Sequence, residues 1–87
     1  MQIYTTTLTS GELVLNKADG AMTICIQVNT ASSCLLTGGI PFKGETPTPI
    51  TMDANQVFNF TAASASSPLD GITITWVSGS VDIVIGF

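Results

Sequence analysis

Residues 22–28 read Met-Thr-Ile-Cys-Ile-Gln-Val, and this short stretch decides the fold class. From Met22 to Val28 every second residue is large and apolar, while Thr, Cys and Gln stand between them. Successive side chains of a β-strand point to opposite faces of a sheet. A period of two therefore predicts a strand with one buried face and one exposed face.

The same alternation recurs along the chain between short turns that contain Gly, Ser, Asn or Asp. It marks further strands at 2–8, 12–16, 34–36, 50–52, 57–61, 72–77 and 81–87. Nearly a third of all residues are Thr, Ile or Val, whose branched side chains favour strands over helices. Strands separated by turns every roughly eight to twelve residues are typical of a sandwich or barrel. The sequence therefore predicts one all-β domain over residues 1–87, a single antiparallel β-sandwich or jelly-roll-like barrel of about eight short strands.

Two places in the first half look like tight hairpins. Asp19–Gly20 is a strong hairpin signal, because Gly adopts positive φ readily and Asp tolerates it. A second reversal after Asn29 would place Cys25 and Cys34 opposite each other on paired strands, close enough for a disulfide. Two reduced cysteines are the favoured alternative, because the sequence shows no export signal.

The composition removes most of the side chains that carry out chemistry. The chain has no His and no Arg, and charged residues make up 9%, against roughly 25% in a typical soluble domain. Without His, a Ser-His-Asp or Cys-His arrangement is impossible within one chain, and two cysteines alone do not make a zinc site. Most of the carboxylates lie in or beside turns, where they cap their own backbone. We therefore expect no catalytic residues, no metal and no cofactor, and we predict that the protein is not an enzyme.

Charge and hydropathy also limit the partners. The net charge is −4 and the two lysines, Lys17 and Lys43, stand alone, whereas nucleic acids and anionic membranes are bound by clustered Lys and Arg. No apolar run approaches the ~18 residues of a spanning helix, and residues 1–12 do not resemble a signal peptide. We expect no nucleic-acid or membrane partner, and synthesis in the cytoplasm of the producing cell.

Four side chains are candidates for intermolecular contact. Residues 41–49 hold three of the four prolines and form the one long loop, so Phe42 is expected to be accessible there. Tyr4 and Phe87 lie near the chain ends, and all three aromatic residues are candidate interface anchors; the alternative is that they close the ends of the core. Trp76 is in line with the apolar residues of 72–77, which favours core packing over a platform for sugars.

Asp82 stands inside the apolar stretch 81–87 and needs its own explanation. On an exposed edge strand, such a charge prevents unwanted strand pairing. Buried at an interface, it would need a counter-charge from Lys17 or Lys43 of a neighbouring copy. The sequence leaves both interpretations open.

Several stretches together resemble a known group of proteins. They are 35–39 (LLTGG), 49–56 (PITMDANQ), 69–74 (LDGITI) and 78–85 (SGSVDIVI). Taken together they are similar to the small β proteins, rich in Thr, Ser and Gly, of tailed-bacteriophage virions. The resemblance implies a β-sandwich or jelly-roll fold, oligomers on a capsid or tail, and a role as a decoration, fibre-base or tail protein without catalytic residues.

The residues alone favour an assembling protein. A chain with so few charges and a mean hydropathy of +0.49 has little to keep its surface separate from its neighbours. We therefore expect a structural virion protein (capsid decoration, head fibre or tail) that forms homo-oligomers, a trimer being favoured, and contacts other virion proteins. The alternative is a carbohydrate- or receptor-binding module that uses Trp76, Tyr4 and the loop 41–49.

Overall fold

The computed structural model describes all 87 residues and contains eight strands. They are β1 (Ile3–Leu8), β2 (Glu12–Leu15), β3 (Thr23–Val28), β4 (Ser33–Gly38), β5 (Ile50–Met52), β6 (Val57–Thr61), β7 (Ile72–Ser78) and β8 (Val81–Gly86). A single turn of 3₁₀-helix, η1 (Lys17–Asp19), lies between β2 and β3. The predicted all-β class and the number of strands are confirmed.

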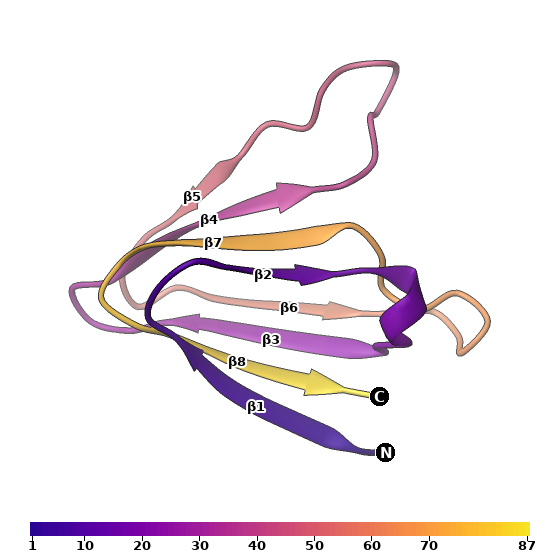
Figure 1. Cartoon of the computed structure of the whole chain (residues 1–87), viewed down its shortest axis with the longest axis horizontal. Coiled ribbons are helices and arrows are strands. Elements are labelled where there is room, and N and C mark those ends of the chain that lie inside the picture. Colours follow the sequence, from indigo (N-terminus) through magenta and orange to yellow (C-terminus); the bar gives the residue numbers. More distant parts are fainter.

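The strands form two four-stranded antiparallel sheets (Figure 1). Sheet A has the order β1-β8-β3-β6, and sheet B has the order β2-β7-β4-β5. Strand one pairs with eight, two with seven, three with six and four with five. The chain is thus a long hairpin rolled up on itself, which is the double Greek-key arrangement of a jelly roll.

Every ladder joins the two halves of the chain. The two remaining pairings, β3 with β8 and β4 with β7, follow the same rule. No two strands from β1 to β4 are hydrogen-bonded neighbours, and the same holds for β5 to β8. The segment 39–49, between β4 and β5, is therefore the closed end of the rolled hairpin.

The connections divide between the two ends of the sandwich. Four tight turns lie at one end, on the left in Figure 1, where the strands converge. The three longer connections lie at the other end with both chain termini, and there the strands spread apart. The segment 39–49 projects from this open end.

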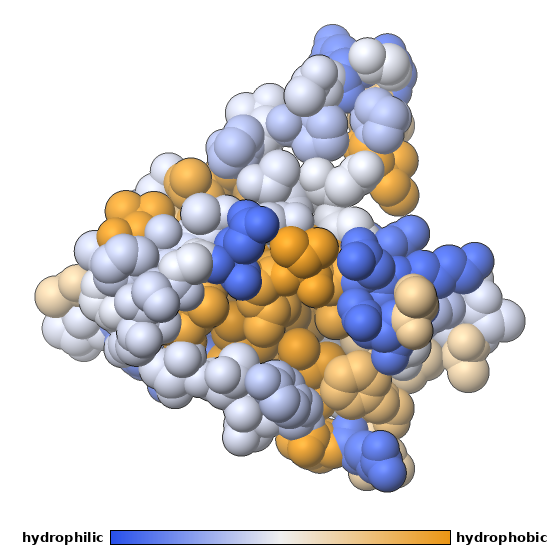
Figure 2. All heavy atoms as spheres, viewed as in Figure 1, coloured by the Kyte–Doolittle hydropathy of each residue, from blue (hydrophilic) through white to orange (hydrophobic).

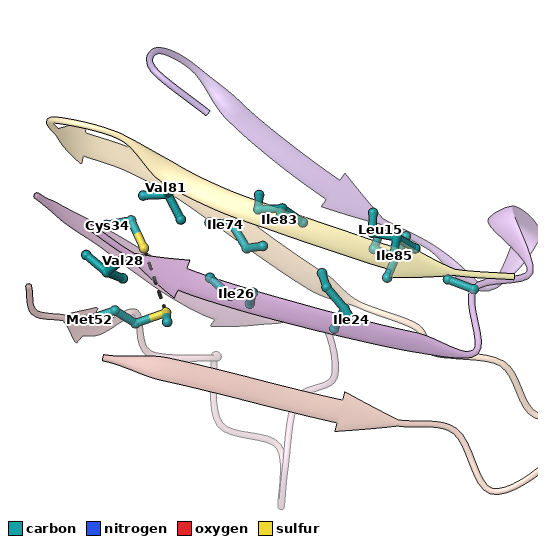
Figure 3. Close-up of a cluster of buried hydrophobic side chains, with 11 residues drawn as sticks. Leu15, Ile24, Ile26, Val28, Cys34, Met52, Ile74, Val81, Ile83 and Ile85 are labelled. Carbon is teal, nitrogen blue, oxygen red and sulfur yellow. Dashed lines mark hydrogen bonds between the residues drawn. The ribbon is translucent and has the colours of Figure 1, made fainter. Parts of the chain in front are cut away.

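The core lies between the sheets and follows the alternation of the sequence. It consists of Leu15, Ala21, Ile24, Ile26, Val28, Cys34, Met52, Ile74, Val81, Ile83 and Ile85 (Figure 3). Ile26 stands between Ile83 of β8 and Phe58 of β6 in the register of sheet A. The thiol of Cys34 faces the sulfur of Met52 at 3.7 Å. Burial of this apolar set supplies the main stabilisation of the fold.

A polar cluster fastens two turns at the converging end. Ser32 is buried, and its Oγ accepts a hydrogen bond from the backbone N–H of Ser80 (2.9 Å). Nδ2 of Asn29 donates to Oγ of Ser80 (2.9 Å) and to Oδ2 of Asp82 (3.2 Å). The turn between β3 and β4 is thereby tied to the turn between β7 and β8.

Both predicted hairpins in the first half are wrong. Asp19–Gly20 and the turn after Asn29 each carry the chain from one sheet to the other, because β3 belongs to sheet A whereas β2 and β4 belong to sheet B. Gly20 does take the left-handed conformation that the signal requires (φ 73°), but it ends η1. The positive φ of Gly20 agrees with the local signal. Which strands pair is decided instead by the packing of the two sheets against each other.

Candidate interaction site

The outer faces of both sheets are nearly free of charge. Register places these side chains outward on sheet A: Ile3, Thr5, Thr7, Thr23, Cys25, Gln27, Val57, Asn59, Thr61, Asp82 and Val84. On sheet B the outward set is Glu12, Val14, Leu35, Thr37, Thr51, Thr73, Thr75 and Val77. Each face therefore carries one charged residue, Asp82 on sheet A and Glu12 on sheet B, among hydroxyl and apolar groups. Such faces can approach another protein with little desolvation of charge.

The first of the two interpretations of Asp82, that it guards an exposed edge strand, is wrong. Asp82 lies on β8, a central strand of sheet A, so it does not guard an edge. Its carboxylate accepts hydrogen bonds from Oγ1 of Thr7 (2.8 Å) and from Nδ2 of Asn29 (3.2 Å). Its partners thus come from its own chain, and no lysine of a neighbour is required to satisfy it.

The segment 39–49, which we call the β4–β5 arm, is the most exposed feature. Ile40 is 70% exposed and Phe42 is 76% exposed. The backbone N–H of Glu45 donates to the carbonyl of Phe42 (3.0 Å), with positive φ at both intervening residues, 54° at Lys43 and 77° at Gly44. These values define a tight two-residue reversal of the I′ kind, so the tip of the arm is a structured turn.

The arm is also stiffened around its apolar tip. Nζ of Lys43 lies 5.4 Å from the centroid of the Phe42 ring, within the range of a cation–π contact. The three prolines of the arm fix φ at their positions. An exposed aromatic ring on a stiff support loses little conformational freedom when it binds, which favours association.

A second feature is the edge groove, which opens between β1 and β2. It is lined by Tyr4, Leu13, Val14, Leu15, Asp19, Ile85 and Phe87, and its volume is about 270 Å³. β1 and β2 are edge strands of different sheets, and they diverge towards the open end of the sandwich. In Figure 2 the apolar atoms of this region fill the hollow between the polar groups. Two residues of the buried core, Leu15 and Ile85, therefore also line this groove.

The structure brings together two of the three predicted anchors. Tyr4 is 51% exposed and Phe87 is 38% exposed, and both line the edge groove. They meet because Gln2 pairs with Phe87 through two backbone hydrogen bonds (2.9 and 3.3 Å), which continues the β1–β8 ladder. Phe42 lies apart from them, on the arm.

The arm-root groove is the second of two hollows, of about 280 Å³, at the base of the arm. Its walls include Ile40 and Thr48 of the arm and Phe60 of β6. Gly39 and Gly71 cross here so closely that a Cβ on Gly39 would lie 2.7 Å from Cα of Gly71. Its lining is more polar than that of the edge groove, with Gly and Thr among its residues.

Trp76 is half-buried and lies at the opposite end of the sandwich from Tyr4. Its indole N–H donates to the carbonyl of Gly79 (2.8 Å), and its backbone N–H donates to the carbonyl of Gly11 (2.9 Å). Tyr4 pairs with Ile85 near the start of β1, at the open end of the sandwich where the chain termini lie. Trp76, Tyr4 and the arm therefore do not converge on one binding surface.

The two cysteines differ in environment and are both free. Cys25 lies on the outer face of sheet A, whereas Cys34 is buried, and burial raises the pKa of its thiol. We expect iodoacetamide to modify Cys25 in the native protein and to spare Cys34, as measured by mass spectrometry, with both modified in denaturant. Because its pKa is raised in the folded state, the Cys34 thiol ionises more readily in the unfolded chain than in the folded chain. Above the ordinary thiol pKa of about 8.5 the free energy of unfolding is therefore expected to fall as pH rises. Equal native modification of both thiols would contradict this assignment.

Sequence reasoning missed the walls of the edge groove. Leu13 and Leu15 lie in the predicted strand 12–16 and Asp19 in a predicted turn, and nothing in their spacing shows that they border one hollow. Ile40 did carry a signal, since a large apolar residue two positions before Phe42 in a proline-rich loop is unusual for an accessible segment. Its exposure was not anticipated.

Comparisons with protein-family models, with curated proteins and with solved structures gave no match. No helix of this chain has the length and apolarity needed to cross a bilayer.

Proposed function

We propose that this protein is a non-enzymatic structural component of a virion, as a capsid-decoration, head-fibre or tail protein, and that it acts through self-assembly and contacts with other virion proteins. The observation that carries the proposal is the surface. Twelve large hydrophobic residues are exposed, while each outer sheet face carries a single charge. A surface of this composition is suited to being covered by other protein.

The sheet edges support the same proposal. β1 and β6, the edge strands of sheet A, contain no charged residue and no proline. Soluble monomers usually protect such edges with charges, prolines or bulges, because an open edge pairs with other strands. In an assembly, neighbouring chains perform this protection.

The fold is compatible with this role, but the fold by itself does not identify the function. Jelly rolls occur in viral capsid proteins and also in lectins, and one fold carries many functions. A lectin-like role would need a platform of aromatic and polar groups. The candidate residues for such a platform, Trp76 and Tyr4, lie at opposite ends of the sandwich. Their separation speaks against a shared sugar-binding platform, and the surface composition supports assembly.

Sedimentation velocity and native mass spectrometry test the proposal in mild buffer at roughly tens of micromolar. We expect species that are multiples of the 9.0 kDa chain. Gold-labelled antibody against the chain is expected to decorate purified virus particles from the producing host in negative stain. A monomer at every concentration, together with unlabelled particles, would overturn the proposal.

A further inference from the structure

We propose that the β4–β5 arm of one copy inserts Phe42 into the edge groove of a second copy of this chain, with Lys43 beside Asp19 of that copy. This inference rests on the proposed self-assembly and specifies its contact. The arm and the groove are the two exposed apolar features at the open end of the sandwich, one projecting and one hollow.

Size and lining suit a phenyl ring. A cavity of about 150 Å³ lined by aliphatic and aromatic side chains accommodates benzene, and the edge groove offers about 270 Å³. Six of its seven lining residues are hydrophobic. Tyr4 and Phe87 are among the lining residues, and aromatic side chains favour contact with another aromatic ring. The arm-root groove has nearly the same volume, but only five of its eleven lining residues are hydrophobic.

Charge gives the contact its direction. Two copies that each carry a net charge of −4 repel one another, and a lysine placed beside a carboxylate of the neighbouring copy offsets part of this repulsion. Lys43 adjoins Phe42 at the tip, and Asp19 lies in the wall of the edge groove. Oδ2 of Asp19 accepts the backbone N–H of Asn16 (2.8 Å), which leaves Oδ1 for the ammonium group.

Phe42 does not lie in the groove of its own chain, since it is 76% exposed. The arm leaves sheet B from β4 and β5, whereas the groove opens beside β2, and the sheet order is β2-β7-β4-β5. At least two strand spacings, about 10 Å, separate the two features, and the arm points away from the sandwich in Figure 1. The contact is therefore intermolecular and uses two different patches, so it generates a closed ring or a filament.

Exposed single substitutions test the contact without disturbing the core. We expect Phe42→Ser to raise the dissociation constant of self-association about tenfold or more, as is typical when a central aromatic anchor is removed. Ala54→Ser, at an exposed position in the tight turn between β5 and β6 at the other end of the sandwich, is the control and should change it less than about twofold. Circular dichroism and thermal unfolding verify that both variants fold.

The charge pair has its own matched variants. Lys43→Asn removes the cation and creates Asn-Gly, the preferred pair for this turn, so the arm keeps its shape. At low salt we expect association to weaken about two- to fivefold, the range of an accessible ion pair. Glu45→Gln removes a negative charge from the same turn and should strengthen association. Raising the salt concentration should reduce both differences.

A mixing experiment tests the direction of the contact. Phe42→Asp disables the arm but leaves the groove intact, whereas Tyr4→Lys places a cation in the groove and leaves the arm intact. Each variant alone should be monomeric, and an equimolar mixture should form a one-to-one heterodimer. A native-like dimer or larger species in both single variants would overturn the inference and leave the proposed function standing. A wild-type chain that is monomeric throughout would overturn both.

Discussion

Replacing Ile26 with alanine is expected to lower the free energy of unfolding by about 2–5 kcal/mol, the range for deletion of a large aliphatic side chain from a packed core. Ile26 is fully buried on β3, a central strand of sheet A. Neighbours from β8 and β6 hold it on both sides, and sheet B lies above it. The cavity left by the substitution cannot be closed by movement of a single strand.

The loss is large for a domain of this size, whose total stability is expected to be roughly 4–13 kcal/mol. Urea unfolding followed by Trp76 fluorescence measures it, with each variant compared at the same protein concentration. Ile3→Ala is the control, because Ile3 has the same side chain but is 58% exposed at the edge of the sheet. We expect that variant to lose less than about 1 kcal/mol. Equal losses in the two variants would contradict the position of the core.

Replacing Gly79 with alanine is the second change with a large expected effect, about 2–4 kcal/mol. Gly79 has φ 71° in the turn between β7 and β8, where a side chain costs about 1–2 kcal/mol. An added Cβ would also overlap the side chain of Ser32. Ser32 would have to move, and its hydrogen bond from the N–H of Ser80 would be lost or distorted.

Gly11→Ala separates these two causes. Gly11 has nearly the same backbone angle (φ 69°), but nothing lies within 4 Å of the position of its added Cβ. Its variant should show the conformational cost alone, about 1–2 kcal/mol. Thermal or urea unfolding of both variants gives the difference. Identical losses would mean that the Ser32 contact makes no contribution.

The strands could be predicted from the sequence because each needs only local information. Alternation placed Ile24, Ile26 and Val28 on one face, and all three are buried. The loop predicted at 41–49 is confirmed, and its prolines are again a local signal. Pairing could not be predicted, because an Asp-Gly turn has the same local geometry whether the next strand lies in the same sheet or crosses to the other.

The candidate site shows the same limit more strongly. Exposure of Phe42 follows from the composition of its loop. The edge groove requires knowledge that β1 and β2 end as neighbouring edges of different sheets, which no spacing along the chain reports. The hydrogen bonds of Asp82 could not be predicted for the same reason, since they depend on β8 lying between β1 and β3. The sequence therefore predicts features that depend on neighbouring residues, such as strands and loops. It does not predict features that depend on which distant strands lie side by side.

The rule that every ladder joins the first half of the chain to the second has a consequence for synthesis on the ribosome. When only residues 1–43 have emerged, none of their four strands has met its native partner, because all partners lie in the half that follows. Nearly the whole chain must be released before the first sheet can close, so the nascent polypeptide spends its elongation time with unpaired, apolar strands. Unpaired apolar strands of this kind are prone to aggregate until their partners arrive.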